Sequence, residues 1–214
     1  KSEVLWTWVG HKDQATEVKN IPIETRVNFI YSGNMGVAQD IFCFGKLAKK
    51  LGNTDGINFL FYGRGSDKAS FEDFVKSEKL SNLTVNDEVS PERLGEIFLE
   101  CDVGILGLDI RHTTSNIPGK FLAYMEAGLP VLAKLNPGND LIDLILDYDV
   151  GCVVITDDLD DLELAARDIV EKVKADPLIS SRCKQLARQV FSIETARDQI
   201  ESFFNSENNH KHFK

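Results

Sequence analysis

The stretch Ile117-Pro-Gly-Lys-Phe-Leu-Ala-Tyr-Met-Glu-Ala-Gly-Leu-Pro-Val-Leu-Ala133 decides the fold of this chain. Pro118 suits a helix start, because the amide that proline lacks has no partner in a first turn. Gly128 suits the left-handed end of the same helix, and residues 130–134 then predict a buried strand. An apolar strand is expected at 102–108, so the helix begins where a parallel strand ends. Free amides and the positive end of the helix dipole make such a position an anion site.

Strands and helices alternate along most of the chain. Strands are expected at 27–31, 57–62, 83–85, 102–108, 130–134 and 151–155, and helices at 38–51, 68–78, 90–100, 118–127, 139–147, 159–175, 177–190 and 194–204. This alternation predicts an α/β fold, a single domain with a doubly wound, Rossmann-like parallel sheet. We expect a linker or N-terminal extension at 1–26, the α/β domain at 27–193, and a C-terminal helix with a frayed tail at 194–214.

Composition excludes several classes of protein. The 214 residues carry a net charge of −10, which argues against a nucleic-acid or anionic-membrane partner. The hydrophobic content of 43% suffices for a core, and no stretch approaches the ~18 apolar residues of a membrane span. The four cysteines are widely spaced in apolar segments, which predicts reduced thiols in a cytoplasmic protein. A first residue other than Met suggests a fragment of a longer chain.

Two glycine loops follow the first two expected strands. Gly33-Asn-Met-Gly36 and Gly63-Arg-Gly65 would let the backbone approach a ligand closely. Neither has the spacing of the dinucleotide-binding fingerprint, and no acidic residue closes the next strand as a ribose anchor. Taken alone, each loop is equally compatible with a plain turn from a strand into a helix.

Together, the motifs resemble a known family. Three of them, Tyr31-Ser-Gly-Asn-Met-Gly36, Gly63-Arg-Gly65 and Cys101-Asp-Val103, precede the segment 117–133 in the order and spacing of the C-terminal domain of GT-B glycosyltransferases of group 1. The resemblance covers about residues 27–204. It implies the donor-binding half of a two-domain enzyme, with an N-terminal acceptor-binding domain before the linker and a last helix that crosses back to that domain.

The resemblance also implies an activity. The family transfers a sugar from a nucleotide-diphosphate donor to an acceptor hydroxyl, with no bound metal and no cofactor beyond the donor. The Pro-Gly-Lys form of the motif is similar to transferases of bacterial surface polysaccharides. We therefore expect a cytoplasmic enzyme, associated with the inner face of the membrane through the missing domain, and a fragment that is inactive alone.

Roles carry over residue by residue. The amides of residues 117–120 would face the diphosphate, and Lys120 would supply a countercharge, although a solvated lysine on the helix surface would look the same. His112 would contact phosphate or sugar, unless it is a solvated loop histidine. The donor-binding residues that the resemblance implies are Gly33, Asn34, Gly36, Arg64, Asn86, Val89, His112, Ser115, Asn116, Ile117, Gly119, Lys120 and Glu126. Of these, Ser115 and Asn116 would bind sugar hydroxyls, and residues 86–89 would line the base pocket.

The sequence departs from the family at the donor pocket. Many members carry two glutamates eight positions apart, whereas this chain has Ser115 and Ala123 there. Glu126 lies on a similar helix face to Ala123 and could replace the ribose-binding carboxylate. The usual Arg and Lys after the first glycine loop are missing near residues 37–40. Ribose recognition and the catalytic residues therefore stay open.

Two other interpretations remain. A nucleotide-sugar epimerase would share the fold, and a non-catalytic domain could keep the fold as a partner-binding module. No metal site is expected. The acidic residues Asp157, Asp158, Asp160 and Asp161 lack calcium-loop spacing and are interpreted as helix caps, and His210 and His212 belong to the polar tail.

Overall fold

A computed structural model describes residues 26–52, 56–111, 117–193, 195, 197, 198, 200 and 201. Its strands are β1 (Val27–Asn34), β2 (Ile57–Arg64), β3 (Leu83–Asn86), β4 (Val103–Gly107), β5 (Val131–Lys134) and β6 (Gly151–Val154). Its helices are η1 (Val37–Gln39), α1 (Ile41–Leu51), α2 (Lys68–Ser77), α3 (Pro91–Phe98), α4 (Gly119–Ala127), α5 (Leu141–Asp147), α6 (Leu159–Ala175) and α7 (Ile179–Val190). The expected linker, with Leu5, Trp6 and Trp8, and the end of the last expected helix, with Phe203 and Phe204, lie outside the described residues.

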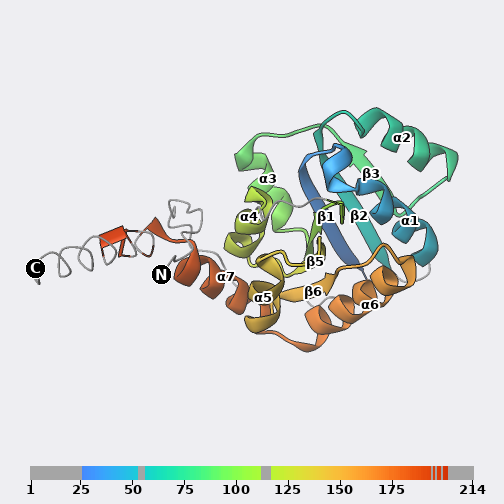
Figure 1. Ribbon diagram of the computed structural model, residues 1–214. Helices are drawn as coiled ribbons and strands as arrows, with labels where there is room; N and C mark the ends of the chain where they lie inside the picture. The colour runs from blue at the N-terminus through green and yellow to red at the C-terminus, as the bar shows by residue number, and fades with distance from the viewer. Residues whose placement is uncertain are drawn as a thin grey trace, which may run out of the picture.

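Helices cover both faces of a single parallel sheet. The six strands lie in the order β3-β2-β1-β4-β5-β6. Figure 1 shows α1, α2 and α6 on one face and α3, α4 and α7 on the other. Each face buries its own apolar cluster, one centred on Phe29, Phe44 and Phe59, the other on Ile30 and Phe121. The strands are buried on both faces, as is typical of parallel sheets, and the predicted doubly wound fold is confirmed.

The chain reverses its direction of winding between β1 and β4. Strand β1 pairs with β2 over the whole register from Val27↔Ile57 to Asn34↔Arg64. Its register with β4 comprises only Phe29↔Val103 and Ile30↔Gly104. Such a reversal opens a crevice beyond the carboxyl ends of the strands, which is where doubly wound folds bind ligands.

The start of the domain differs from expectation in two places. Strand β1 continues through Gly33 to Asn34, so the predicted tight loop begins later than its first glycine. The predicted helix at 38–51 is interrupted. A 3-10 turn ends at Asp40, whose φ of 42° is left-handed, and α1 then begins at Ile41. Aspartate tolerates this conformation better than most residues, and the interruption leaves the Asp40 carboxylate at the carboxyl end of the sheet.

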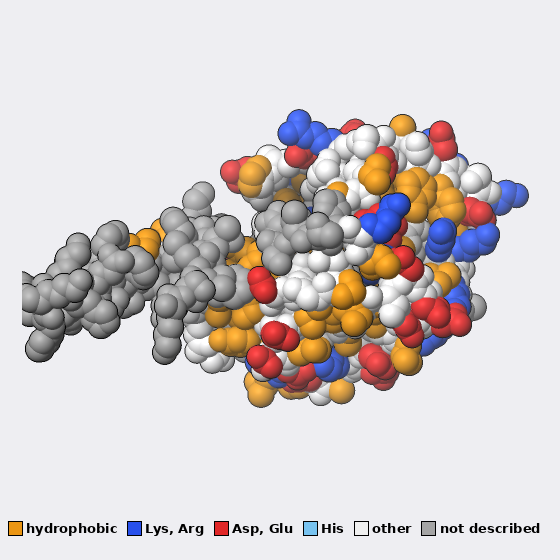
Figure 2. All heavy atoms as spheres, viewed as in Figure 1, with side chains coloured by type: hydrophobic (Ala, Val, Ile, Leu, Met, Phe, Trp, Pro, Cys, Tyr) orange, Lys and Arg blue, Asp and Glu red, His pale blue; other side chains and the backbone are white. Residues whose placement is uncertain are grey.

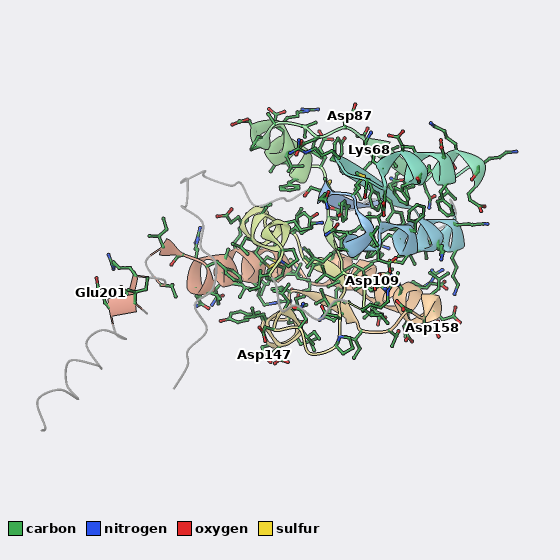
Figure 3. The ribbon with its side chains drawn as sticks, turned by 45° about the horizontal axis from the view of Figure 1, so that its top comes forward. Lys68, Asp87, Asp109, Asp147, Asp158 and Glu201 are labelled. Carbon is green, nitrogen blue, oxygen red and sulfur yellow. The ribbon has the colours of Figure 1, made fainter. Side chains whose placement is uncertain are left out.

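Several predicted helix ends are confirmed. The carboxylate of Asp158, which Figure 3 labels, accepts a hydrogen bond from the amide of Asp160 at 2.7 Å at the start of α6. This geometry is the N-cap expected of the acidic cluster, with Asp160 and Asp161 in the first turn. Asp157, also interpreted as a cap, instead pairs with Lys134. Gly128 ends α4 in the left-handed conformation with a φ of 78°. The four cysteines are all present as thiols.

The surface carries charges of both signs. On the face drawn in Figure 2, Lys and Arg side chains lie among Asp and Glu side chains rather than in one basic field. This pattern agrees with the net charge of −10. Among the described residues, each helix is too short or too polar to cross a bilayer.

Candidate functional site

Hydrogen bonds fix the first glycine loop at the carboxyl end of β1. The Tyr31 hydroxyl donates to the Asn34 carbonyl, and the Asn34 side-chain amide donates to Oε1 of Gln39 at 2.9 Å. Gly33 has a φ of 115°, a conformation that a residue with a side chain rarely adopts. The loop is therefore held in place before any ligand arrives.

The second glycine loop packs directly against the first. A Cβ atom on Gly63 would lie 1.8 Å from the carbonyl oxygen of Gly33, so only glycine permits this contact. The Met35 amide donates to the Arg64 carbonyl at 2.7 Å, and the Asp67 amide donates to the Met35 carbonyl at 2.9 Å. The structure thus brings together the two glycine loops that the sequence singled out.

Lys120 extends from the start of α4 toward this loop. Its Nζ lies 3.7 Å from the centre of the Tyr31 ring. A Cβ atom on Gly33 would lie 3.8 Å from Lys120 Cε, so the lysine stem runs beside the loop. Burial lowers the pKa of the Lys120 amine to about 7. Among the described residues, none forms an ion pair or a hydrogen bond with this amine, which leaves its charge available to a ligand.

The first turn of α4 also offers backbone donors. Pro118 is the N-cap, and the Phe121 amide donates to the Pro118 carbonyl at 2.8 Å. Within the described part of the chain, the amides of Ile117, Gly119 and Lys120 have no acceptor. First-turn amides lack partners inside a helix, and their dipole favours an anion. Lys120 and these amides thus belong to the start of α4, and their contact with a diphosphate stays a prediction.

Tyr124 connects α4 to β1, and the sequence analysis missed it. Its hydroxyl accepts from the Ser32 amide at 3.0 Å and donates to the Ile30 carbonyl at 3.1 Å. Its ring occupies the space beside Gly104, where a Cβ atom would lie 2.4 Å away. These two hydrogen bonds fix the position of α4 relative to β1 and the first glycine loop. Burial of the phenol raises its pKa, so it stays a neutral donor.

Asp87 and Glu88 belong to the segment expected to line the base pocket, and both form ion pairs. Lys68 Nζ lies 2.8 Å from Asp87 Oδ1, a pair labelled in Figure 3, and Arg64 Nε lies 3.1 Å from Glu88 Oε2. The two carboxylates are therefore turned toward cations of the neighbouring loop, and Arg64 is engaged with a protein group.

The rest of this segment lies where a base could contact it. The Asn86 side-chain amide donates to the Phe61 carbonyl at 3.3 Å at the end of β3. Val89 is half-buried and packs on the apolar cluster beneath α3 and α4. Both residues hold the segment 86–89 at the carboxyl end of the sheet. Their contact with a base stays a prediction.

A second feature that the sequence analysis missed is a buried lysine at the end of β5. Lys134 Nζ lies 2.6 Å from Asp40 Oδ2 and 2.6 Å from Asp157 Oδ1, and its side chain is only 3% exposed. Burial opposes the charged amine, but the two carboxylates outweigh it and raise its pKa. Lys134 thereby joins the loop before α1 to the loop before α6. Neither carboxylate is near Lys134 in the sequence, so no local pattern could reveal the contact.

An ion pair also fixes the described residues of the loop that follows β4. The Arg111 guanidinium and backbone amide both bond the Asp109 carboxylate, with Nε and N each 2.9 Å from Oδ1. These bonds hold the pKa of Asp109 well below its ordinary value. The Asp109 amide donates to the Ala38 carbonyl at 3.0 Å, so the β4 loop also supports the first glycine loop.

Some predicted site residues remain without a structural test. His112, Ser115 and Asn116 lie outside the described residues. Ala123 is half-buried on α4 and packs against the apolar cluster on that face of the sheet. Glu126 is half-buried on the same helix, and its contact with a ribose stays a prediction. Among the described residues, no group of three His, Cys, Asp or Glu side chains could hold a metal ion.

The sequence matches one family model, over residues 26–172, which is described as "Glycosyl transferases group 1". The chain belongs to this family. The predicted glycosyltransferase membership is thereby confirmed over more than half of the chain. No curated protein matches the sequence.

Solved structures share the fold of this glycosyltransferase domain. The catalytic domain of cholesterol-α-glucosyltransferase from Helicobacter pylori has a TM-score of 0.59 at 15% identity, with 78% of this chain and 98% of that chain covered. The apo lipopolysaccharide outer core galactosyltransferase WaaB has a TM-score of 0.71 at 14% identity, with 95% and 56% covered. HepE from Anabaena, in complex with UDP and glucose, has a TM-score of 0.63 at 12% identity, with 85% and 49% covered. This chain thus spans about half the length of the last two proteins.

Proposed function

We propose that this domain binds the nucleotide-diphosphate sugar of a GT-B glycosyltransferase and places its diphosphate at the start of α4. One observation carries the proposal. The Lys120 amine lies against the first glycine loop with no carboxylate partner among the described residues, at a helix end with free amides. A diphosphate would satisfy both the charge and the donors. The complex of HepE with UDP and glucose is one precedent within the shared fold.

The same arrangement would assist transfer of the sugar to an acceptor hydroxyl. As the bond between sugar and diphosphate breaks, negative charge gathers on the leaving group. Donors that are already in position stabilise that charge without reorganising, and Lys120 with the first amides of α4 are such donors. In this mechanism the cation is a side chain, so we propose that the reaction needs no metal and no cofactor beyond the donor.

The acceptor side belongs to a partner domain. We propose that an N-terminal acceptor-binding domain of the same enzyme closes over the carboxyl ends of the strands and excludes water from the donor. We place the enzyme in the cytoplasm, at the inner face of a bacterial membrane, in the synthesis of a surface polysaccharide. Two observations support this placement. The Pro-Gly-Lys segment resembles that of transferases of bacterial surface polysaccharides, and the fold is shared with a lipopolysaccharide galactosyltransferase.

Calorimetric titration tests the proposal. Nucleoside diphosphates with different bases, and their parent nucleosides, are titrated into the chain. We expect at least one diphosphate to bind more tightly than its nucleoside. Lys120→Ala should weaken diphosphate binding by about 1.5–3 kcal/mol, because a charge-assisted contact is lost. Lys46→Ala, at an exposed position of α1, is the matched control and should change nothing.

Two outcomes would count against the proposal. Equal affinities for a nucleoside and its diphosphate would show that no phosphate site exists at α4. A complete absence of binding would favour the alternative of a non-catalytic partner-binding module.

A further inference from the structure

The cations at the carboxyl ends of the strands fall into two kinds. Most pair with carboxylates, namely Arg64 with Glu88, Lys68 with Glu72 and Asp87, Arg111 with Asp109, and Lys134 with Asp40 and Asp157. Lys120 is different, because its partner among the described residues is the ring of Tyr31. In a chain with 34 acidic residues, a lysine that faces a ring instead of a carboxylate can attract an anionic ligand.

A carboxylate and an aromatic ring hold a lysine in different ways. A carboxylate cancels the charge of the ammonium and repels an approaching phosphate. A ring attracts the ammonium through its negative face and remains neutral. Lys120 is therefore held in place without a carboxylate that would cancel the charge of its protonated form.

We propose that Tyr31 is the positioning residue that selects a diphosphate at this site, by holding the Lys120 ammonium beside Gly33 without neutralising it. The inference rests on the proposed function, and it adds a second residue to the contact. Tyr31 itself does not touch the ligand in this arrangement. It acts through Lys120.

Tyr31 is built to serve as a rigid support. Its side chain is fully buried, and its ring stacks on Phe61 with centroids 5.1 Å apart. Burial and stacking hold the ring in place beside Lys120, whereas the hydroxyl donates to the Asn34 carbonyl. The hydroxyl and the ring thus have separable roles, one in shaping the loop and one in holding the amine.

Fluorination of the ring separates these roles. Tyr31→Phe removes the hydroxyl and serves as the reference. Phenylalanines with one, two and three fluorines at position 31 then weaken the negative face of the ring step by step while nearly keeping its shape. We expect the fold to be preserved through the series, because the ring nearly keeps its volume, which a truncation such as Tyr31→Leu would not do.

Two quantities are measured on each protein. The first is the pKa of Lys120, followed by NMR of ¹³C-labelled lysine, and the second is the affinity for a nucleoside diphosphate and for its nucleoside. Each fluorine should lower the Lys120 pKa further, because the ring supports the charged form less. Diphosphate affinity should fall by about three- to thirtyfold across the series, and nucleoside affinity should stay constant.

The same fluorinated residues at position 59 are the matched control. Phe59 is buried in the same sheet and stacks on Phe29, with centroids 5.2 Å apart. Fluorination there should leave both the Lys120 pKa and the diphosphate affinity unchanged.

The outcomes separate this inference from the proposed function. A Lys120 pKa and a diphosphate affinity that stay constant along the series would overturn the role of Tyr31 and leave the proposed function intact. Failure of the parent chain to bind any diphosphate would overturn the proposed function, and with it the selection by Tyr31.

Discussion

The Tyr124 hydroxyl accepts a hydrogen bond from the Ser32 amide at 3.0 Å and so ties helix α4 to strand β1. This is a contact between the helix that carries Lys120 and the strand that carries Tyr31. A small shift of α4 relative to β1 would move the Lys120 amine away from the first glycine loop. The bond is therefore a natural first target for mutation.

Tyr124→Phe should destabilise the domain by about 1–3 kcal/mol, because the variant leaves the buried Ser32 amide without its acceptor. Denaturant unfolding followed by circular dichroism gives the free energy of unfolding of both proteins. Tyr148→Phe, at a half-buried position that follows α5, is the control and should change little. Equal stabilities of Tyr124→Phe and the parent would contradict the role assigned to the hydroxyl.

Gly63→Ala should destabilise the protein strongly, because its Cβ atom would lie 1.8 Å from the Gly33 carbonyl oxygen. Overpacking costs about 1–3 kcal/mol where side chains can adjust, and a backbone oxygen adjusts less, so we expect the upper end. Gly95→Ala is the matched control. No atom lies within 4 Å of its added Cβ on α3, and alanine in a helix should stabilise by about 0.5–1 kcal/mol. Thermal unfolding of both variants distinguishes them, and a neutral Gly63→Ala would refute the close packing of the two loops.

Lys134→Met should lower the free energy of unfolding by about 1–3 kcal/mol, because two carboxylates lose a common buried partner. The expected loss is smaller than for a fully buried pair, because the side chains of Asp40 and Asp157 are 29% and 63% exposed. Lys50→Met is the control, since Lys50 also pairs with two carboxylates but at the surface, and it should have little effect. Chemical denaturation compares the variants, and similar losses at both positions would show that burial of Lys134 adds nothing.

Diphosphate binding should weaken as the pH rises above 7. The Lys120 pKa is about 7 in the free protein, and a bound diphosphate raises it because the anion favours the charged amine. Affinity is therefore fully present below pH 7 and falls by up to about tenfold per pH unit above it. A nucleotide-diphosphate sugar titrated calorimetrically between pH 7 and 8.5 measures the effect. Lys120→Arg, which stays charged throughout, should give a flat profile, and a flat profile in the parent would contradict the prediction.

The fold was predictable because its signals are local. Alternating apolar runs placed the strands, and Pro118 and Gly128 marked the ends of α4 within one residue. The start of α1 was not predictable in the same way. The helical pattern at 38–51 continues through Asp40, whereas the structure breaks it there, because Asp40 bonds Lys134 from a strand that lies 94 positions later.

The candidate site was predictable only in part. The glycine loops and Lys120 have a recognisable spacing, and the structure brings them together as expected. Tyr31 opens a motif that the sequence analysis quoted, but nothing in the motif predicted its contact with Lys120. Tyr124 and Lys134 lie in an apolar helix and strand, where no local pattern indicated their contacts. Their partners lie on other elements, and only the tertiary fold shows which hydroxyl or amine meets which backbone group.

The narrow join between β1 and β4 has a consequence for how this site comes into being. Phe29 and Val103 are 74 positions apart in the sequence, and they form one of the two residue pairs that join β1 to β4 and so link the halves of the sheet. Tyr31 belongs to the first half and Lys120 to the second, so neither half can display the paired cation on its own. Contacts that close long stretches of chain form late, because they cost the most chain entropy. We expect newly made chains to acquire secondary structure and most of each core before they acquire affinity for an anion, so that ligand binding reports the final step of folding.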